Sequence, residues 1–319
     1  MRIVLAGASG TIGRAVAALL VAEGHEVLCP RRPGRSLPVP GVTALDCDLG
    51  VAGSLAGALA GVPGGARIDA VISCMATRSG APADAWAVDH DAQLTLMTET
   101  AAAGAGHFIL LSAICVQKPR LAFQQAKRAF EARLVASGLD WSIVRPTAFF
   151  KSLSGQVARV QAGRPFVVFG DGRLTACKPI SDRDLARFIV SCLTDPERRG
   201  RILPIGGPGP AITPMDQAER LFALLDRPPR IRHVPVAMMD AIAGTLGMLG
   251  HVSGRLRDKA EFARTGRYYA TESMLVWDAA RSRYDADATP EFGQDRLWDH
   301  YADLIAGRAV TDLGAHAMF

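Results

Sequence analysis

Three glycines near the beginning of the chain form the pattern with the clearest chemical meaning. Gly7, Gly10 and Gly13 follow an apolar run that starts at residue 3, and a helical pattern then continues to residue 22. Glycine lets the backbone turn tightly and approach a pyrophosphate, whose charge is stabilised at a helix N-terminus. A strand, a glycine turn and a helix in this order predict a dinucleotide site, the alternative being a strand–helix turn without a ligand. The other residues of the turn are expected to contact the cofactor as well: Ser9, Thr11 and Ile12.

Two arginines follow the expected second strand, which covers residues 26–29. In NAD sites an acidic residue usually ends this strand and binds the 2′-hydroxyl of the ribose. Arg31 and Arg32 stand here instead. A guanidinium group matches a phosphate in charge and in hydrogen-bonding geometry. The pair therefore predicts NADPH rather than NADH as the cofactor, and a solvated basic loop is the alternative.

Further cofactor contacts are expected where the later strands end. Asp48 follows the expected third strand, at residues 43–46, and is placed either to contact the adenine or to cap the next helix. Ligands of open α/β sheets bind outside the carboxyl ends of the strands. The remaining candidates at such positions are Cys74, Met75, Ser112 and Pro146.

These elements must be arranged as an α/β fold. Short apolar runs alternate with helical patterns over the first 150 residues, which is typical of a parallel sheet covered by helices. The strands are expected at residues 2–6, 26–29, 43–46, 70–73, 107–112 and 140–145, and the helices at 12–22, 51–59, 85–103 and 124–137. We therefore expect a Rossmann-type doubly wound sheet as an NADP-binding core (residues 1–150). A smaller substrate-binding region (residues 151–319) would return some strands and helices to that core.

A catalytic pair is incomplete in this chain. The pattern above resembles the short-chain dehydrogenase/reductase superfamily in its extended or atypical branch, which implies Tyr-x-x-x-Lys after the fifth strand. The chain has Phe-Gln-Gln-Ala-Lys at residues 123–127. Phe123 cannot donate a proton, whereas Lys127 can bind a ribose and stabilise nearby negative charge, or can be an ordinary exposed lysine. The missing tyrosine argues against an ordinary sugar or alcohol dehydrogenase.

Longer stretches carry a more specific resemblance. The chain has Ala-Ile-Cys-Val-Gln-Lys-Pro at residues 113–119 and Thr-Ala-Cys-Lys-Pro-Ile-Ser at residues 175–181. Together with residues 145–153, 165–172 and 268–274, they resemble the divinyl chlorophyllide 8-vinyl-reductase family of photosynthetic organisms. The resemblance spans nearly the whole chain and is to the form that uses NADPH without an iron–sulfur cluster or a flavin.

The resemblance implies a reaction that suits a site without tyrosine. The C8 vinyl group of a magnesium-containing tetrapyrrole is reduced to ethyl in chlorophyll or bacteriochlorophyll biosynthesis. Hydride would add to the terminal vinyl carbon, and the resulting charge would spread over the macrocycle, so a weaker acid suffices than for an alkoxide. The proton would come from water, from Lys127 or from another side chain, and Phe123 would pack against the ring.

A flat macrocycle also needs a wide apolar pocket. Phe149 and Phe150 are candidates to line it, with Met238 and Met239 as an adaptable wall. Core packing is the alternative for these four residues. The candidates to bind the propionate carboxylate are Lys151, Arg173 and Lys178, and an ordinary surface charge is the alternative for each of them.

The composition is that of a globular protein without a metal site. The chain has 319 residues, of which 49% are hydrophobic and 21% charged, and a net charge of +5 that suits acidic small ligands. The sequence has no long basic run of the kind that indicates nucleic-acid binding. Neither the six cysteines nor the seven histidines have metal-ligand spacing. Scattered cysteines and the lack of a signal peptide or membrane span indicate the cytoplasm, with transient contact to photosynthetic membranes implied by the resemblance.

Two other functions stay open. One is a different atypical reductase that acts on a conjugated double bond. The other is a redox sensor or assembly factor that binds NADP without turning it over, which the phenylalanine at position 123 would allow. The oligomeric state and the choice between chlorophyllide and protochlorophyllide have no signal in the sequence.

Overall fold

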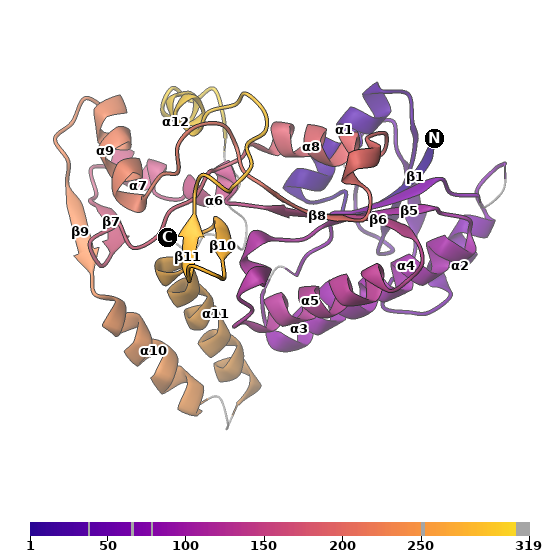
Figure 1. Ribbon diagram of the computed structural model, residues 1–319, viewed down its shortest axis with the longest axis horizontal. Coiled ribbons are helices and arrows are strands. Elements are labelled where there is room, and N and C mark those ends of the chain that lie inside the picture. Colours follow the sequence, from indigo (N-terminus) through magenta and orange to yellow (C-terminus); the bar gives the residue numbers. More distant parts are fainter. Residues whose placement is uncertain (38, 65–66, 78, 250–252, 311–319) are drawn as a thin grey trace. The chain divides into compact units, whose positions relative to one another are not determined.

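The computed structural model describes residues 1–37, 39–64, 67–77, 79–249 and 253–310 (Figure 1). The chain divides into two compact units. Unit 1 consists of Met1–Thr77, Pro82–Arg145 and Leu185–Leu203, and unit 2 of the other described residues. After Arg145 the chain runs through unit 2 as far as Asp184, and Leu185–Leu203 then belong to unit 1 again.

A seven-stranded sheet forms the centre of the fold. Its strands are β1 (Arg2–Ala6), β2 (Glu26–Arg31), β3 (Thr43–Asp46), β4 (Ala70–Ser73), β5 (His107–Leu111), β6 (Asp140–Pro146) and β8 (Arg201–Ile205), in the order β3-β2-β1-β4-β5-β6-β8. The pairings from β3 through to β6 are all parallel. The strand order reverses between β1 and β4, which is the topological switch point of a doubly wound sheet. The Rossmann-type fold expected from the sequence is confirmed.

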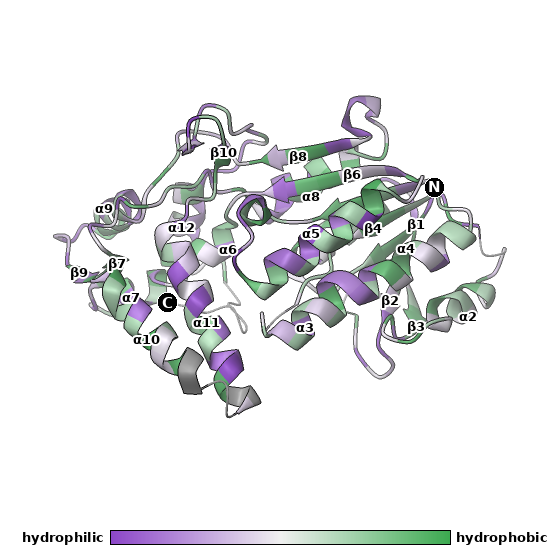
Figure 2. Ribbon diagram, turned by 60° about the horizontal axis from the view of Figure 1, so that its bottom comes forward, coloured by the Kyte–Doolittle hydropathy of each residue, from purple (hydrophilic) through white to green (hydrophobic). Residues whose placement is uncertain are grey.

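Helices cover both faces of this sheet. On one side lie α3 (Pro82–Trp86), α4 (Ala92–Ala102) and α5 (Ala122–Val135), and on the other lie α1 (Thr11–Ala22) and α8 (Asp182–Ser191) (Figure 1). Strands buried from both sides are apolar throughout: β4 is Ala-Val-Ile-Ser and β5 is His-Phe-Ile-Leu-Leu, with every residue buried. The central strands are accordingly coloured mostly hydrophobic in Figure 2.

The helices differ from the sequence expectation in two places. The helix expected from residue 51 begins only at α2 (Ser54–Ala60), because a turn precedes it. The helix expected over residues 85–103 is interrupted by a π-helical turn, η1 (Ala87–Asp91), between α3 and α4. A short 3₁₀ turn, η2 (Ile114–Gln117), leads from β5 towards α5, and another, η3 (Pro196–Arg198), precedes β8.

Unit 2 combines two small sheets with helices. Strand β7 (Phe166–Phe169) pairs in parallel with β9 (Ile231–Val234), and β10 (Val276–Asp278) pairs antiparallel with β11 (Arg283–Asp285). The helices are α6 (Phe150–Leu153), α7 (Val157–Gln161), α9 (Pro214–Leu224), α10 (Val236–Leu249), α11 (Gly254–Thr271) and α12 (Leu297–Ile305). Among the residues that the structure describes, no helix combines the length and the apolar character needed to cross a membrane.

Candidate cofactor site and active site

The glycine turn lies at the switch point of the sheet. Gly7 directly follows β1 and has a φ of +81°, a conformation that favours glycine. A β-carbon on Gly7 would lie 2.6 Å from the backbone carbon of Cys74, so the turn also touches the segment that leaves β4. The backbone amide of Gly10 donates to the carbonyl of Gly7 at 3.0 Å and closes the turn.

Gly13 lets the first helix approach this turn. A β-carbon on Gly13 would lie 2.1 Å from the carbonyl oxygen of Gly7, so α1 packs directly on the turn. The first turn of α1 has no acidic residue, and its N-cap residue, Gly10, provides no side-chain cap. The positive end of the helix is therefore available to an anion.

Several predicted cofactor residues gather at this edge. Cys74 donates its backbone N–H to the carbonyl of Ala6 at 2.9 Å, so Cys74 and Met75 lie beside the glycine turn. Burial raises the pKa of the Cys74 thiol to about 12, which keeps it neutral. In the turn itself, Ser9 is exposed, Thr11 half-buried and Ile12 buried. The arrangement fits a dinucleotide, whose phosphates would lie against the backbone amides of the turn and the N-terminus of α1.

The two arginines after β2 have different surroundings. Nε of Arg31 donates to Oδ1 of Asp46 at 2.8 Å, because the parallel register places Asp46 opposite Arg31. Arg32 is exposed, and its side chain has no ion-pair partner among the described residues. The sequence analysis missed Asp46, whose position beside Arg31 follows only from the strand register. Arg32 is therefore the less constrained of the two guanidinium groups, and binding of a 2′-phosphate by either arginine stays a prediction.

Asp48 stabilises the turn before α2. Its Oδ1 accepts from the backbone N–H of Gly50 at 2.9 Å, and its own N–H donates to Ser54 Oγ at 2.9 Å. The residue that caps α2 is Gly53, so the alternative role of Asp48 as the helix N-cap is wrong. Its contact with adenine stays a prediction.

Lys127 is buried in an ion pair. Its Nζ lies 2.9 Å from Oδ1 of Asp89, and the two residues are 7% and 1% exposed. The alternative of an ordinary exposed lysine is therefore wrong. Phe123 is half-buried one turn earlier on α5, on the same face of the helix. Asp89 lies on the π-helical turn. The sequence analysis missed this residue, because the helical pattern around it does not indicate a contact with Lys127.

A second buried charge pair lies further along α5. Glu131 accepts from Nε of Arg145 at 3.0 Å and also from Nη2 of the same guanidinium. Ser112 Oγ donates to Glu131 Oε1 at 2.7 Å. The hydroxyl proton of Ser112, a predicted cofactor contact, is therefore directed at Glu131.

The predicted substrate residues all belong to unit 2. Phe150 is 5% exposed and its ring lies 5.6 Å from the ring of His300, which agrees with the core-packing alternative. Phe149 is half-buried at the N-cap of α6. On α10, Met239 reaches Gly266 of α11, whereas Met238 is 50% exposed. Pro146, at the end of β6, is buried and also belongs to unit 2.

Lys178 is not a surface charge. It is 6% exposed, and its Nζ lies 2.6 Å from Glu291 Oε1. The Lys178 ammonium lowers the pKa of the Glu291 carboxyl, with the backbone N–H of Gly209 as a further cause. The pair ties residues distant in the sequence together within unit 2 and leaves little reason to assign Lys178 to a substrate carboxylate.

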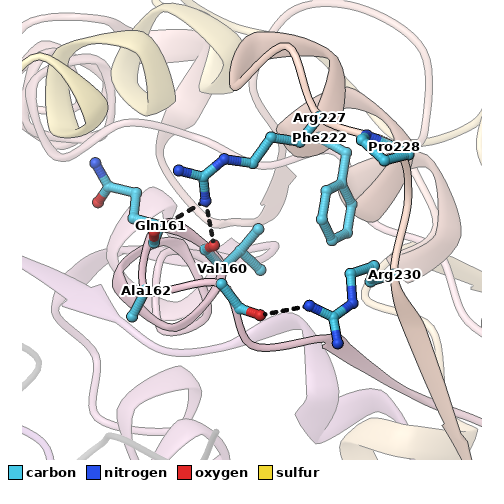
Figure 3. Close-up of a pocket in the computed structure, with 8 residues that line it drawn as sticks. Val160, Gln161, Ala162, Phe222, Arg227, Pro228 and Arg230 are labelled. Carbon is cyan, nitrogen blue, oxygen red and sulfur yellow. Dashed lines mark hydrogen bonds between the residues drawn. The ribbon is translucent and has the colours of Figure 1, made fainter.

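Unit 2 also contains a pocket of about 530 Å³ at the end of α7 (Figure 3). Arg227 donates to the carbonyls of Val160 and Gln161, and Arg230 donates to that of Gly163. Arg227 thereby satisfies the last carbonyls of α7, and Arg230 binds a carbonyl of the turn that follows the helix. None of the predicted cofactor or substrate residues lines this pocket. Within the described ranges, no group of three or more His, Cys, Asp or Glu side chains could hold a metal ion.

Comparisons with known proteins agree with this geometry. A family model described as NAD(P)H-binding matches residues 7–196. The chain is 45% identical to divinyl chlorophyllide a 8-vinyl-reductase of Oryza sativa subsp. indica, over 99% of the chain and 82% of that protein. It is 44% identical to the protein of the same name from Zea mays, with the same coverage. Leucoanthocyanidin reductase of Vitis vinifera has a similar fold, with a TM-score of 0.68 and 16% identity over 96% of this chain and 100% of that structure.

Proposed function

The chain belongs to the divinyl chlorophyllide a 8-vinyl-reductase family of oxidoreductases, and from that premise we propose that it reduces the C8 vinyl group of a divinyl chlorophyllide or protochlorophyllide to ethyl. NADPH is the proposed electron donor, and the proposed pathway is chlorophyll or bacteriochlorophyll biosynthesis. The observation that carries the proposal is the match to these reductases over almost the full chain. A cytoplasmic location with transient contact to photosynthetic membranes stays a prediction.

The residues of unit 1 fit the cofactor that this reaction needs. The backbone at Gly7 and Gly13 leaves no room for a β-carbon and brings the N-terminus of α1 to the place where the pyrophosphate would bind. Arg32 would hold the 2′-phosphate, and Lys127 would donate hydrogen bonds to a ribose. When bound, NADPH supplies the hydride for the vinyl group, and a proton completes the reduction.

The chain's own contribution to the chemistry is mainly electrostatic. The Lys127 ammonium, held at Asp89, is a fixed positive charge that would stabilise negative charge on the substrate. Phe123 has no proton to give, and a charge spread over a macrocycle makes less demand on an acid than an alkoxide does. The absence of the tyrosine is therefore compatible with reduction of a conjugated vinyl group.

A spectroscopic assay tests the proposal. We expect the protein, incubated with NADPH and either divinyl pigment, to shift the Soret band to that of the monovinyl product. The fall in NADPH absorbance should correspond to one molecule of NADPH oxidised for each molecule of pigment reduced. Running both pigments decides which one is the substrate. Binding of NADPH without any change of the pigment would contradict the proposal and favour the redox sensor or assembly factor.

Replacing Arg32 with alanine tests the choice of dinucleotide. We expect the Kd for NADPH to rise about 10- to 100-fold, because a charge-assisted hydrogen bond to phosphate contributes about 1.5–3 kcal/mol. The Kd for NADH is expected to stay unchanged, since NADH has no 2′-phosphate. Fluorescence titration measures both constants, with Arg128→Ala on the exposed side of α5 as the control. An equal loss for the two dinucleotides would show that Arg32 does not recognise the phosphate.

A further inference from the structure

A buried polar cluster surrounds Lys127 and is built from three elements of unit 1. They are the segment that leaves β4 (residues 73–77), the π-helical turn η1 with the start of α4 that continues it, and helix α5. The residues of the cluster that carry the argument are Thr77, Asp89, Gln93, Gln124 and Lys127. Neither the sequence motifs nor the comparisons assign a role to Asp89.

Asp89 connects two of these elements. Its Oδ1 lies 2.9 Å from Nζ of Lys127 on α5, and both of its carboxylate oxygens lie 3.4 Å from the backbone N–H of Thr77. Its side chain is fully buried. A buried carboxylate and a buried ammonium are each costly alone, so the pair holds the Lys127 head group in one place.

Helix α4, which directly continues the π-helical turn, also fixes the chain beside the glycine turn. Gln93, four residues after Asp89, accepts from Ser73 Oγ at 2.8 Å, and its amide nitrogen lies 3.5 Å from the carbonyl of Met75. The backbone of Cys74 and Met75 is the part that touches Gly7. Isolated π-helical turns are frequent at functional sites, and here the turn aims Asp89 at Lys127. The position of the ammonium is thereby tied to the position of the proposed dinucleotide site.

The cluster is incomplete without a further polar group. Thr77 Oγ1 and Gln124 Nε2 are buried and have no hydrogen-bond partner among the described residues. Thr77 adjoins Asp89, and Gln124 lies one turn before Lys127 on α5. Buried polar atoms in proteins are nearly always paired, so such atoms next to an ion pair indicate a place that a ligand or a water completes. The pair of Glu131 and Arg145 on the same helix differs, because its polar atoms satisfy one another and Ser112.

We propose that Asp89 is the positioning residue of Lys127, and that it fixes the ammonium as a hydrogen-bond donor to the bound dinucleotide. This inference rests on the proposed function for the reaction, but it concerns cofactor binding first. Asp89 does not touch the cofactor and acts only through Lys127. The ammonium has three hydrogens, of which Asp89 takes one, so donors remain for a ribose.

A double-mutant cycle tests the inference. We expect Asp89→Asn, which keeps the size of the side chain and removes its charge, to raise the Kd for NADPH about tenfold and to lower kcat at least tenfold, with the KM for the pigment unchanged. In a Lys127→Met background the same change should alter neither quantity by more than about twofold, because Asp89 has no ammonium left to position. Equal effects of Asp89→Asn in both backgrounds, or wild-type values in the single variant, would overturn the proposal.

Two further measurements keep the result unambiguous. Lys127→Met leaves a buried carboxylate without a partner and is expected to melt earlier, whereas the double variant has no buried charge at this position and is expected to regain stability. The stability measurements therefore show whether each variant of the cycle is folded.

Asp91→Asn is the matched control for Asp89→Asn. Asp91 lies on the same π-helical turn with a side chain that is 69% exposed, so this substitution should leave NADPH affinity unchanged. If Asp91→Asn weakens NADPH binding as much as Asp89→Asn does, the effect comes from the turn and not from the ion pair, and the proposal fails.

The measurement of NADPH affinity separates this inference from the proposed function. NADPH affinity is measured by fluorescence without any pigment. A wild-type protein that leaves the vinyl group intact would contradict the proposed function, while the cycle in NADPH affinity would still decide the role of Asp89. Normal reduction of the pigment with additive effects of the two substitutions would overturn the role of Asp89 alone.

Discussion

Replacing Gly13 with alanine is expected to weaken NADPH binding by at least about 100-fold. The new methyl carbon would lie 2.1 Å from the carbonyl oxygen of Gly7 and 2.9 Å from the α-carbon of Ala8. Both neighbours are backbone atoms, so helix α1 must move away from the turn, at a cost of about 1–3 kcal/mol or more. That movement displaces the amide groups that would bind the pyrophosphate. Fluorescence titration with NADPH measures the loss, and circular dichroism reports whether the fold persists.

Two other glycines provide the controls for this experiment. Gly57 lies exposed in α2 with nothing within 4 Å of an added β-carbon, so Gly57→Ala should bind NADPH normally and gain about 0.5–1 kcal/mol of stability. Gly10 has a φ of −77°, and its added β-carbon would lie 3.4 Å from Gly7, a distance that small shifts can accommodate. Gly10→Ala should therefore fold. If this folded variant binds NADPH more weakly, the added methyl group hinders the phosphate directly and does not act by destabilising the turn. Unchanged NADPH binding in Gly13→Ala would disprove the proposed pyrophosphate site at the glycine turn and the N-terminus of α1.

The parts of the site that could be predicted from the sequence are local. The glycine turn and the start of α1 depend on residues within one short stretch, and Gly7 and Gly13 each have a steric reason in the structure. The first six strands also lie within about two residues of their predicted bounds, because each is a short apolar run that ends at a polar residue or a turn. The fold class follows from their alternation with helices.

The partners of the charged site residues could not be predicted in this way. Asp46 meets Arg31 through the register of two strands, and Asp89 meets Lys127 through the packing of two helices. Both contacts depend on tertiary arrangement, about which the spacing of residues in one segment is silent. The π-helical turn was missed for a related reason, since its residues continue a helical pattern that does not distinguish a π-helical turn from an α-helical one. Both contacts concern what neutralises a charge, and the binding of the cofactor by Arg31 and Lys127 stays a prediction.

Replacing Arg145 with methionine is expected to lower the free energy of unfolding by about 3–5 kcal/mol. Arg145 is 9% exposed and is bound through two nitrogens to Glu131, which is 3% exposed. Removing one member of a buried ion pair leaves the other charge without compensation, which costs far more than the pair itself contributes. Urea unfolding measures the change. Glu131→Leu should have an effect of similar size, and the double variant should recover most of the loss because neither charge is then buried.

An exposed pair separates burial from charge as the cause. Arg199 and Asp140 lie 3.0 Å apart with side chains that are 45% and 57% exposed, so Arg199→Met should change the free energy of unfolding by no more than about 0.5 kcal/mol. Equal effects at the two pairs would mean that burial is not the cause. The double variant also tests Ser112, whose hydroxyl loses its acceptor when Glu131 is replaced. If NADPH binds the stable double variant as tightly as the wild type, Ser112 does not need that hydrogen bond to contact the cofactor; weaker binding would mean that Glu131 orients the Ser112 hydroxyl.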